Sequence, residues 1–269
     1  MSRIVAVANQ KGGVGKTTTT INLAASLALA DQRVLLVDVD PQGNLTSGVG
    51  QKGKSTPAGT IYQALTSPEP LTDCRPFMVA TAIDRMALLP ADRNLTGAEI
   101  DLVTLSRREE RLRTLLASVR DQFDYILIDC PPSLGLLTLN ALVAADAVLI
   151  PLHCEYFALE GLADLVGTMR RVRAGLNPSL DIEGVLLTMF DERTNLGQQV
   201  ANDVRQFFKE KVYRTVIPRN VRLGEAPSHG MPVILYDVKS RGAEAYLALA
   251  REFLARNGSP PAQAKEQHG

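Results

Sequence analysis

A glycine-rich loop with two lysines, Gln10 to Thr18, carries residue types that bind phosphate. Glycines let the backbone N–H groups of such a loop turn inward around phosphate oxygens, and the helix that follows presents its positive end. Lys16 then neutralises the β- and γ-phosphates, and the Thr17 hydroxyl is a ligand for Mg²⁺. We therefore expect ATP and Mg²⁺ to be bound by the loop residues Lys11, Gly12, Gly13, Val14, Gly15, Lys16, Thr17 and Thr18.

The loop departs at two positions from the common phosphate-binding pattern G-x-x-x-x-G-K-[ST]. Gln10 stands in place of the first glycine, and Lys11 places a second lysine inside the loop. A glycine-rich turn with solvated lysines is the alternative interpretation. The apolar run before the loop and the helical pattern after it favour the phosphate site.

Three aspartates follow apolar runs and are candidates for the chemistry around the phosphates. Asp38 and Asp40 follow the run that ends at Val37, and strand alternation predicts that both point at the same phosphate site. Asp129 directly follows a second run, where an acid commonly assists Mg²⁺, so we expect it in the outer shell of the metal. Carboxylates hold metal-bound water and orient an attacking water. Capping of the following turn is the alternative role for Asp38 and Asp40.

The elements that must position these residues alternate along the chain. Continuous apolar runs, typical of strands covered on both faces, are Ile4 to Ala8, Val34 to Val37, Tyr125 to Ile128, Ala147 to Leu152 and Ile182 to Leu187. Helical patterns occur at Thr17 to Ala30, Arg107 to Arg120, Leu136 to Ala145, Leu159 to Leu176 and Gly197 to Lys211. This alternation predicts a doubly wound α/β fold with a mostly parallel sheet, helices on both faces, and ligands at the carboxyl ends of the strands.

We expect a single domain over residues 1–256. Gly43 to Thr60 is rich in Gly, Ser, Thr and Lys, and is interpreted either as a mobile switch segment or as an ordinary surface connection. Residues 257–269 contain two prolines and mostly small or polar residues, which predicts a disordered polar tail.

Bulk composition limits the function classes only weakly. Lys plus Arg and Asp plus Glu both number 29, so any nucleic-acid surface must be a local patch. The three cysteines form no CxxC pair, which favours a reducing compartment over a disulfide framework or a zinc site. We find no leader pattern and no apolar run long enough to span a membrane, and we expect a cytoplasmic protein.

The loop Lys11 to Thr17 resembles the deviant Walker A motif, K-G-G-x-G-K-[ST], of the ParA/MinD ATPases, a branch of the P-loop NTPases. The resemblance implies that Lys11 reaches the phosphates of the nucleotide held by a partner subunit, so that ATP binding drives formation of a homodimer. It also implies that Asp38 lies near the Mg²⁺ shell, whereas Asp40 positions the hydrolytic water. Lys11, Lys16 and Asp40 are therefore the expected catalytic residues of a slow ATPase.

Longer stretches resemble the chromosome-partition branch, the ParA/Soj proteins, from Arg3 to about Leu254. They are Asp38 to Asn44, Cys154 to Leu162, Thr188 to Leu196 and Ile217 to Gly230. This resemblance implies that ATP-bound dimers bind non-specific double-stranded DNA on the nucleoid, and that a ParB-type partner protein stimulates hydrolysis. It also implies that Pro218, Arg219 and Asn220 lie beside the adenine.

Basic residues are enriched near the C-terminus. From Arg193 to Arg256, Lys and Arg outnumber Asp and Glu by roughly two to one, a strip that could neutralise phosphates without reading bases. On composition alone, a solvated basic face is the better explanation, and it is the resemblance that favours DNA. The expected DNA contacts are Arg193, Arg222, Lys239 and Arg241.

Three other functions share this scaffold. A MinD-like positioning ATPase would anchor to a membrane through a basic amphipathic C-terminal helix, whereas residues 239–256 show the apolar stripe of a core helix. A metabolic or redox enzyme, such as an ATP-using synthetase, is a second alternative. A pure binding module is a third, which the presence of Lys16, Thr17, Asp40 and Asp129 disfavours.

Overall fold

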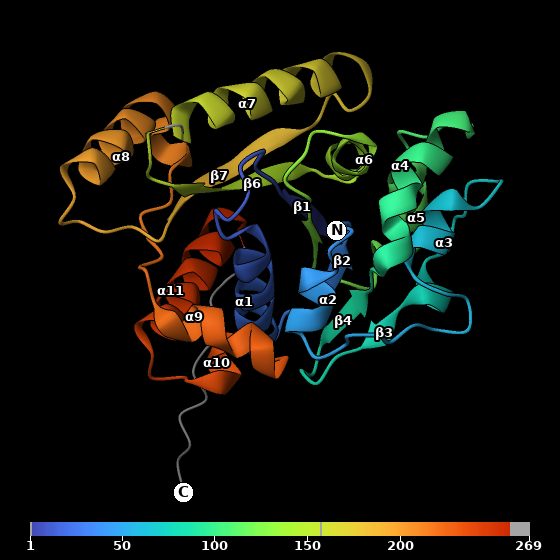
Figure 1. Cartoon of the computed structure of the whole chain (residues 1–269), viewed down its shortest axis with the longest axis horizontal. Coiled ribbons are helices and arrows are strands. Elements are labelled where there is room, and N and C mark those ends of the chain that lie inside the picture. The colour runs from blue at the N-terminus through green and yellow to red at the C-terminus, as the bar shows by residue number, and fades with distance from the viewer. Residues whose placement is uncertain (1, 157, 259–269) are drawn as a thin grey trace, which may run out of the picture.

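The computed structural model describes residues 2–156 and 158–258, and its centre is a seven-stranded sheet (Figure 1). The strand order is β3-β4-β2-β5-β1-β6-β7, and neighbouring strands are parallel except for β3 and β4. The predicted doubly wound, mostly parallel sheet is confirmed. The strands are β1 (Arg3–Val7), β2 (Val34–Asp38), β3 (Val79–Ala80), β4 (Met86–Leu89), β5 (Tyr125–Asp129), β6 (Ala147–His153) and β7 (Asp181–Thr188).

Helices cover both faces of this sheet (Figure 1). One hydrophobic layer contains α3 (Ile61–Thr66), α4 (Ala98–Asp101), α5 (Arg111–Leu116), α6 (Leu136–Ala144), α7 (Ala158–Gly175) and α8 (Asn195–Phe208). The other contains α1 (Lys16–Leu29), α2 (Asn44–Gly48), α9 (Val221–Glu225), α10 (Val233–Tyr236) and α11 (Arg241–Arg256). In β1, Ile4 and Ala6 face the first layer while Val5 and Val7 face the second, because successive side chains point to opposite faces. This explains why the strands are continuous apolar runs.

Several elements differ from the sequence-based expectation. The helix predicted over Arg107 to Arg120 is shorter, because a turn with Arg107 at φ 50° precedes α5 and a 3₁₀ turn, Ala117–Val119, follows it. The elements β3, β4, α3 and α4 are not predicted from the sequence, because they are too short to show a clear period. The helical pattern before Arg256 is α11, whose first turn is capped by Ser240 Oγ accepting from the N–H of Ala243 at 3.2 Å.

Two glycines allow segments far apart in the sequence to touch backbone to backbone. Gly50 has φ 74° and Gly230 has φ 66°, both in the left-handed region that favours glycine. A Cβ added at Gly50 would lie 3.0 Å from the carbonyl oxygen of Gly230, and one added at Gly230 would lie 2.7 Å from the Cα of Gly50. The predicted loop Gly43 to Thr60 therefore begins with a helix, α2, and is packed against a distant turn near its middle.

The C-terminal end of the described chain is held by hydrogen bonds. The side-chain amide of Asn257 donates to Glu183 Oε1 at 3.0 Å and to the carbonyl of Phe253 at 2.8 Å. Residues 259–269 of the predicted tail lie outside the described residues. Within residues 2–156 and 158–258, no helix has the length and apolar character needed to span a bilayer.

Candidate functional site

The glycine-rich loop lies between β1 and α1, at the carboxyl end of β1, which pairs with β5 and β6 inside the sheet. Gly13 at φ 71° and Gly15 at φ 88° adopt backbone conformations that side chains disfavour, so these positions require glycine. The Thr188 hydroxyl, at the end of β7, donates to the carbonyl of Val14 at 2.7 Å. The ammonium of Lys16 donates to the carbonyl of Lys11 at 3.0 Å, which closes the loop on itself. The loop is thus shaped by its own lysine and by a strand two positions away in the sheet.

A cavity of about 560 Å³ opens at this loop, within the size range of small-molecule sites. It brings together many of the predicted residues, namely Gly12, Gly13, Gly15, Lys16, Thr17, Thr18, Asp40, Pro218, Arg219 and Asn220. Ile217, Leu223 and Tyr246 add an apolar wall that the sequence analysis did not predict. The cavity is therefore lined by a polar loop with phosphate-binding residue types and by apolar side chains against which a nucleotide base can pack.

Four predicted residues do not line this cavity: Lys11, Val14, Asp38 and Asp129. Val14 is buried beneath the loop, and its contribution is the carbonyl held by Thr188. Asp129 stands one layer behind the cavity, where it accepts hydrogen bonds from Thr17 Oγ1 at 2.7 Å and Thr20 Oγ1 at 3.2 Å. Burial raises the pKa of Asp129 well above its usual range, and the nearby charge of Asp38 raises it further.

Asp38 and Asp40 differ in their access to the cavity, since Asp40 lines it and Asp38 is buried behind it. The strand β2 ends at Asp38, whose Oδ2 accepts from both the N–H of Thr46 at 2.8 Å and the Thr46 hydroxyl at 2.7 Å. Burial raises the pKa of Asp38 to about 7. Asp40 follows the strand and lines the cavity, while its Oδ1 accepts from the N–H of Gln42 at 2.9 Å. The two aspartates are in contact, because the N–H of Asp40 donates to Asp38 Oδ1 at 3.2 Å.

The donor set at Thr17 fits Mg²⁺. A hydroxyl beside a carboxylate supplies the hard oxygen ligands that this ion takes together with phosphates and water. No group of three or more His, Cys, Asp or Glu residues suited to a metal occurs in the described part of the chain.

Lys11 points to an acidic neighbour in its own subunit. Its ammonium pairs with Glu155 Oε2, and Glu155 Oε1 lies 2.7 Å from Nδ1 of His153. The backbone N–H of Lys11 donates to Asn9 Oδ1 at 3.0 Å, while the Asn9 amide donates to the carbonyl of Pro151 at 2.8 Å. Neither His153 nor Glu155 is predicted as a site residue from its local sequence.

Two of the four residues predicted to contact DNA, Arg193 and Arg222, form ion pairs with carboxylates. The guanidinium of Arg193 donates two hydrogen bonds to Asp191, the shorter being 2.7 Å, and the side chain of Arg193 is 88% exposed. Arg222 on α9 pairs with Glu225 at 2.8 Å and with Asp237 at 3.2 Å. The ion pair with Asp237 places Arg222 beside the turn that contains Lys239 and leads to Arg241 at the start of α11. Arg193 belongs to a different segment, just before α8.

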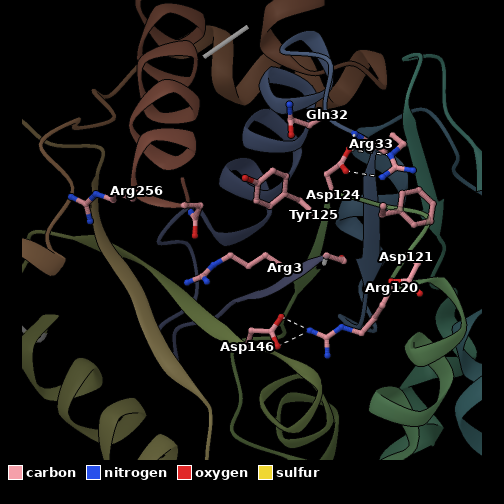
Figure 2. A pocket seen from close by; sticks show the side chains of 12 residues that line it. Arg3, Gln32, Arg33, Arg120, Asp121, Asp124, Tyr125, Asp146 and Arg256 are labelled. Atoms are coloured by element: carbon pink, nitrogen blue, oxygen red, sulfur yellow. Dashed lines mark hydrogen bonds and ion pairs between the residues drawn. The ribbon is translucent and has the colours of Figure 1, made fainter. Parts of the chain in front are cut away.

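A second cavity, of about 660 Å³, lies at the opposite edge of the sheet, where β1, β2 and β5 begin (Figure 2). Its arginines face carboxylates: Arg33 pairs with Asp124 at 2.8 Å and Arg120 with Asp146 at 2.6 Å. Because these charges are neutralised and the strands present their amino ends here, this cavity is a poorer candidate for a polyphosphate than the loop site.

Comparison with known proteins identifies the family. The AAA domain family matches residues 2–182. The chain is 56% identical to the chromosome partitioning protein ParA of Myxococcus xanthus, over 96% of this chain and 89% of that protein. It is 57% identical to the sporulation initiation inhibitor protein Soj of Bacillus subtilis, over 96% of this chain and all of that protein. The chain belongs to the ParA/Soj family of chromosome-partitioning ATPases. The expected resemblance is thereby confirmed.

Solved structures place this ParA/Soj chain among nucleotide-binding relatives. A structure of cobyrinic acid a,c-diamide synthase from Mycobacterium smegmatis with a bound ATP analogue and magnesium is 38% identical, with a TM-score of 0.81 over 96% of this chain and 97% of that one. The cell division ATPase MinD of Pyrococcus furiosus is 27% identical, with a TM-score of 0.77 over 95% and 99%. Both identities are below those of the partition proteins.

Proposed function

We propose that this chain binds and hydrolyses ATP with Mg²⁺, dimerises in its ATP state, and binds non-specific double-stranded DNA to act in chromosome or plasmid partition. The observation that carries the proposal is the cavity that joins Lys16, Thr17 and Asp40 to the segment 217–220. The identity of more than 50% to partition proteins favours this role over a membrane-positioning ATPase or a synthetase.

Each residue at the loop has a distinct task in this proposal. Lys16 neutralises the β- and γ-phosphates, and the glycine backbone of the loop supplies N–H donors to their oxygens. Thr17 would hold Mg²⁺ directly, with Asp129 behind it, and the ion would supply charge neutralisation at the transferring phosphoryl group. Asp38 lies farther back, where its bonds to Thr46 connect the site to α2.

Asp40 is the group proposed to position the attacking water. It lines the cavity, and its hydrogen bond from Gln42 fixes the direction of the carboxylate. Hydrolysis depends mainly on placing water in line with the γ-phosphate rather than on strong proton abstraction. A single oriented carboxylate is sufficient for that task.

Lys11 is proposed to act across a dimer interface. Its side chain does not line the cavity of its own subunit, which is consistent with a task at the nucleotide of a partner. A cation that completes the partner's site makes nucleotide binding and dimerisation one coupled equilibrium. The active form would then be a homodimer that holds two ATP molecules.

The DNA contacts are proposed at Arg193, Arg222, Lys239 and Arg241. Arg222 lies on α9, and its neighbour Leu223 lines the nucleotide cavity, so one short helix touches both the cavity and the basic surface. A ParB-type partner would stimulate hydrolysis and release the protein from DNA. In a cell, the ATP-bound protein would be cytoplasmic and associated with the nucleoid.

One experiment tests the central proposal. Light scattering after size exclusion and retention on plasmid DNA are measured on the same sample without nucleotide, with ADP and with a non-hydrolysable ATP analogue. Dimerisation and DNA retention with the analogue alone are expected. A single subunit at saturating analogue contradicts the proposed dimer, and vesicle binding in place of DNA binding favours the membrane role.

A further inference from the structure

Glu155 occupies a turn that faces the phosphate loop. The strand β6 ends at His153, and α7 begins at Ala158. The N–H of Glu155 donates to the carbonyl of His153 at 2.8 Å, and the N–H of Ala158 donates to the carbonyl of Glu155 at 3.0 Å. These bonds hold the backbone at Glu155, so the side chain reaches Lys11 from a defined position.

The carboxylate of Glu155 has basic neighbours from three segments. Lys11 comes from the phosphate loop and His153 from β6, and both pair with Glu155. Arg219 comes from the segment that lines the nucleotide cavity, and its charge acts on Glu155 as well. The hydrogen bond from Lys11, followed by the charges of these neighbours, holds the pKa of Glu155 below its usual range. Glu155 is therefore ionised at neutral pH.

A lysine ammonium held by this carboxylate is not free to meet a phosphate of another subunit. We propose that Glu155 is a positioning residue that retains Lys11 within its own subunit and competes with the phosphates of the partner's nucleotide. The inference rests on the proposed role of Lys11 across the dimer interface. Glu155 would then set the nucleotide and protein concentrations at which the dimer forms.

The expected size of the effect follows from exposure. The side chains of Lys11 and Glu155 are 33% and 47% exposed, so water screens their attraction. An exposed ion pair of this kind shifts an equilibrium by up to about fivefold. Because a symmetric dimer opens two such pairs, removing both should lower its dissociation constant by up to about 25-fold.

The test is a titration of the full chain in Mg²⁺ and a non-hydrolysable ATP analogue, with dimer formation followed by sedimentation velocity. Glu155→Gln removes the charge and keeps the size of the side chain. Glu160→Gln is the matched control, since Glu160 is an exposed acid in the first turn of α7. The dimer dissociation constant should fall by more than about twofold and up to about 25-fold for Glu155→Gln, and stay within about twofold for Glu160→Gln.

A second pair of variants connects the effect to Lys11. In a Lys11→Ala background, Glu155→Gln should cause no further change, because no ammonium remains to be released. Glu155→Asp, which keeps the charge, should stay closer to wild type than Glu155→Gln. In the absence of nucleotide, Glu155→Gln should also increase labelling of Lys11 by an amine reagent, measured by mass spectrometry.

The outcomes separate this inference from the proposed function. Equal or weaker dimerisation of Glu155→Gln, with wild type dimerising normally, overturns the role of Glu155 and leaves the dimer in place. Unchanged labelling of Lys11 in that variant also contradicts it, even if the variant is too unstable for sedimentation. Failure of wild type to dimerise with the analogue contradicts the proposed function itself.

Discussion

Thr17 Oγ1 donates a hydrogen bond of 2.7 Å to Asp129 Oδ2, which joins the first turn of α1 to the end of β5. The bond fixes the rotamer of a hydroxyl that is exposed to the cavity on its other side. The buried carboxylate of Asp129, at the end of β5, thus orients the Thr17 side chain in α1. Such support behind a metal ligand affects the affinity for the metal without contact to the nucleotide.

Asp129→Asn should weaken binding of the magnesium–nucleotide complex about 10- to 100-fold, because the amide supports Thr17 and the ion less well. Isothermal titration with ADP, with and without Mg²⁺, measures the effect. In excess EDTA the variant and wild type should bind ADP with similar affinity. A loss of equal size in EDTA would assign Asp129 to the fold of the loop instead.

Lys16→Ala should abolish ATP binding, because the ammonium closes the loop through the carbonyl of Lys11 and is the cation that we propose for the β- and γ-phosphates. Fluorescent nucleotide titration measures this loss. Lys52→Ala, in an exposed turn, is the control for removal of a lysine. Undiminished affinity of Lys16→Ala would refute the assignment of the phosphate loop.

Asp40→Ala should bind ATP and dimerise, yet lower the turnover rate at least about 100-fold, because the attacking water is no longer positioned. The variant should therefore remain on plasmid DNA after wild type has dissociated. Phosphate release and DNA retention over time provide the two measurements. Asp84→Ala, an exposed acid between β3 and β4, should behave as wild type. Normal turnover without Asp40 would exclude its proposed role.

Arg222→Glu should lose affinity for DNA while keeping ATP-driven dimerisation. Each phosphate contact contributes roughly one unit to the slope of log affinity against log salt, so a dimer should lose about two units. DNA retention across a salt series tests this slope. Arg171→Glu reverses a charge on α7, far from α9, and should leave the slope unchanged (Figure 1). An unaltered slope for Arg222→Glu would remove this residue from the DNA surface.

Gly50→Ala should destabilise the protein more than Gly53→Ala, although both glycines have nearly the same positive φ, 74° and 73°. The left-handed conformation costs roughly 1–2 kcal/mol for either alanine. Only at Gly50 does the added Cβ also meet a backbone atom, at 3.0 Å, whereas Gly53 faces open space. Chemical denaturation compares the two free energies of unfolding, and equal losses would show that the contact with Gly230 is unimportant.

Local chemistry explains which features the sequence could predict. The phosphate loop and α1 are encoded by adjacent glycines, lysine and an alanine-rich helix, and their positions agree with the structure to within about one residue. The strands β1, β2, β5, β6 and β7 are apolar enough to stand out. By contrast, β3 and β4 span two and four residues, too few for a period to emerge.

Contacts between distant residues were beyond the reach of sequence patterns. Lys11 and Glu155 are 144 positions apart, and nothing in either local pattern indicates that their side chains meet. The pairing of Arg222 with Asp237 depends likewise on how α9 packs beside α10. The different surroundings of Asp38 and Asp40 follow from where β2 stops, which periodicity places only approximately.

The hydrogen bond from the Thr188 hydroxyl to the carbonyl of Val14 joins the end of β7 to the phosphate loop that follows β1. β7 is the last strand in the order, and the segment 212–217 covers its outer side, where the N–H of Tyr213 donates to the carbonyl of Val185 at 2.9 Å and the N–H of Ile217 donates to the carbonyl of Leu187 at 2.9 Å. Any opening of its carboxyl end also releases a carbonyl that shapes the phosphate loop. A ligand bound in the phosphate loop should therefore slow amide hydrogen exchange at the carboxyl end of β7, two strands away in the sheet.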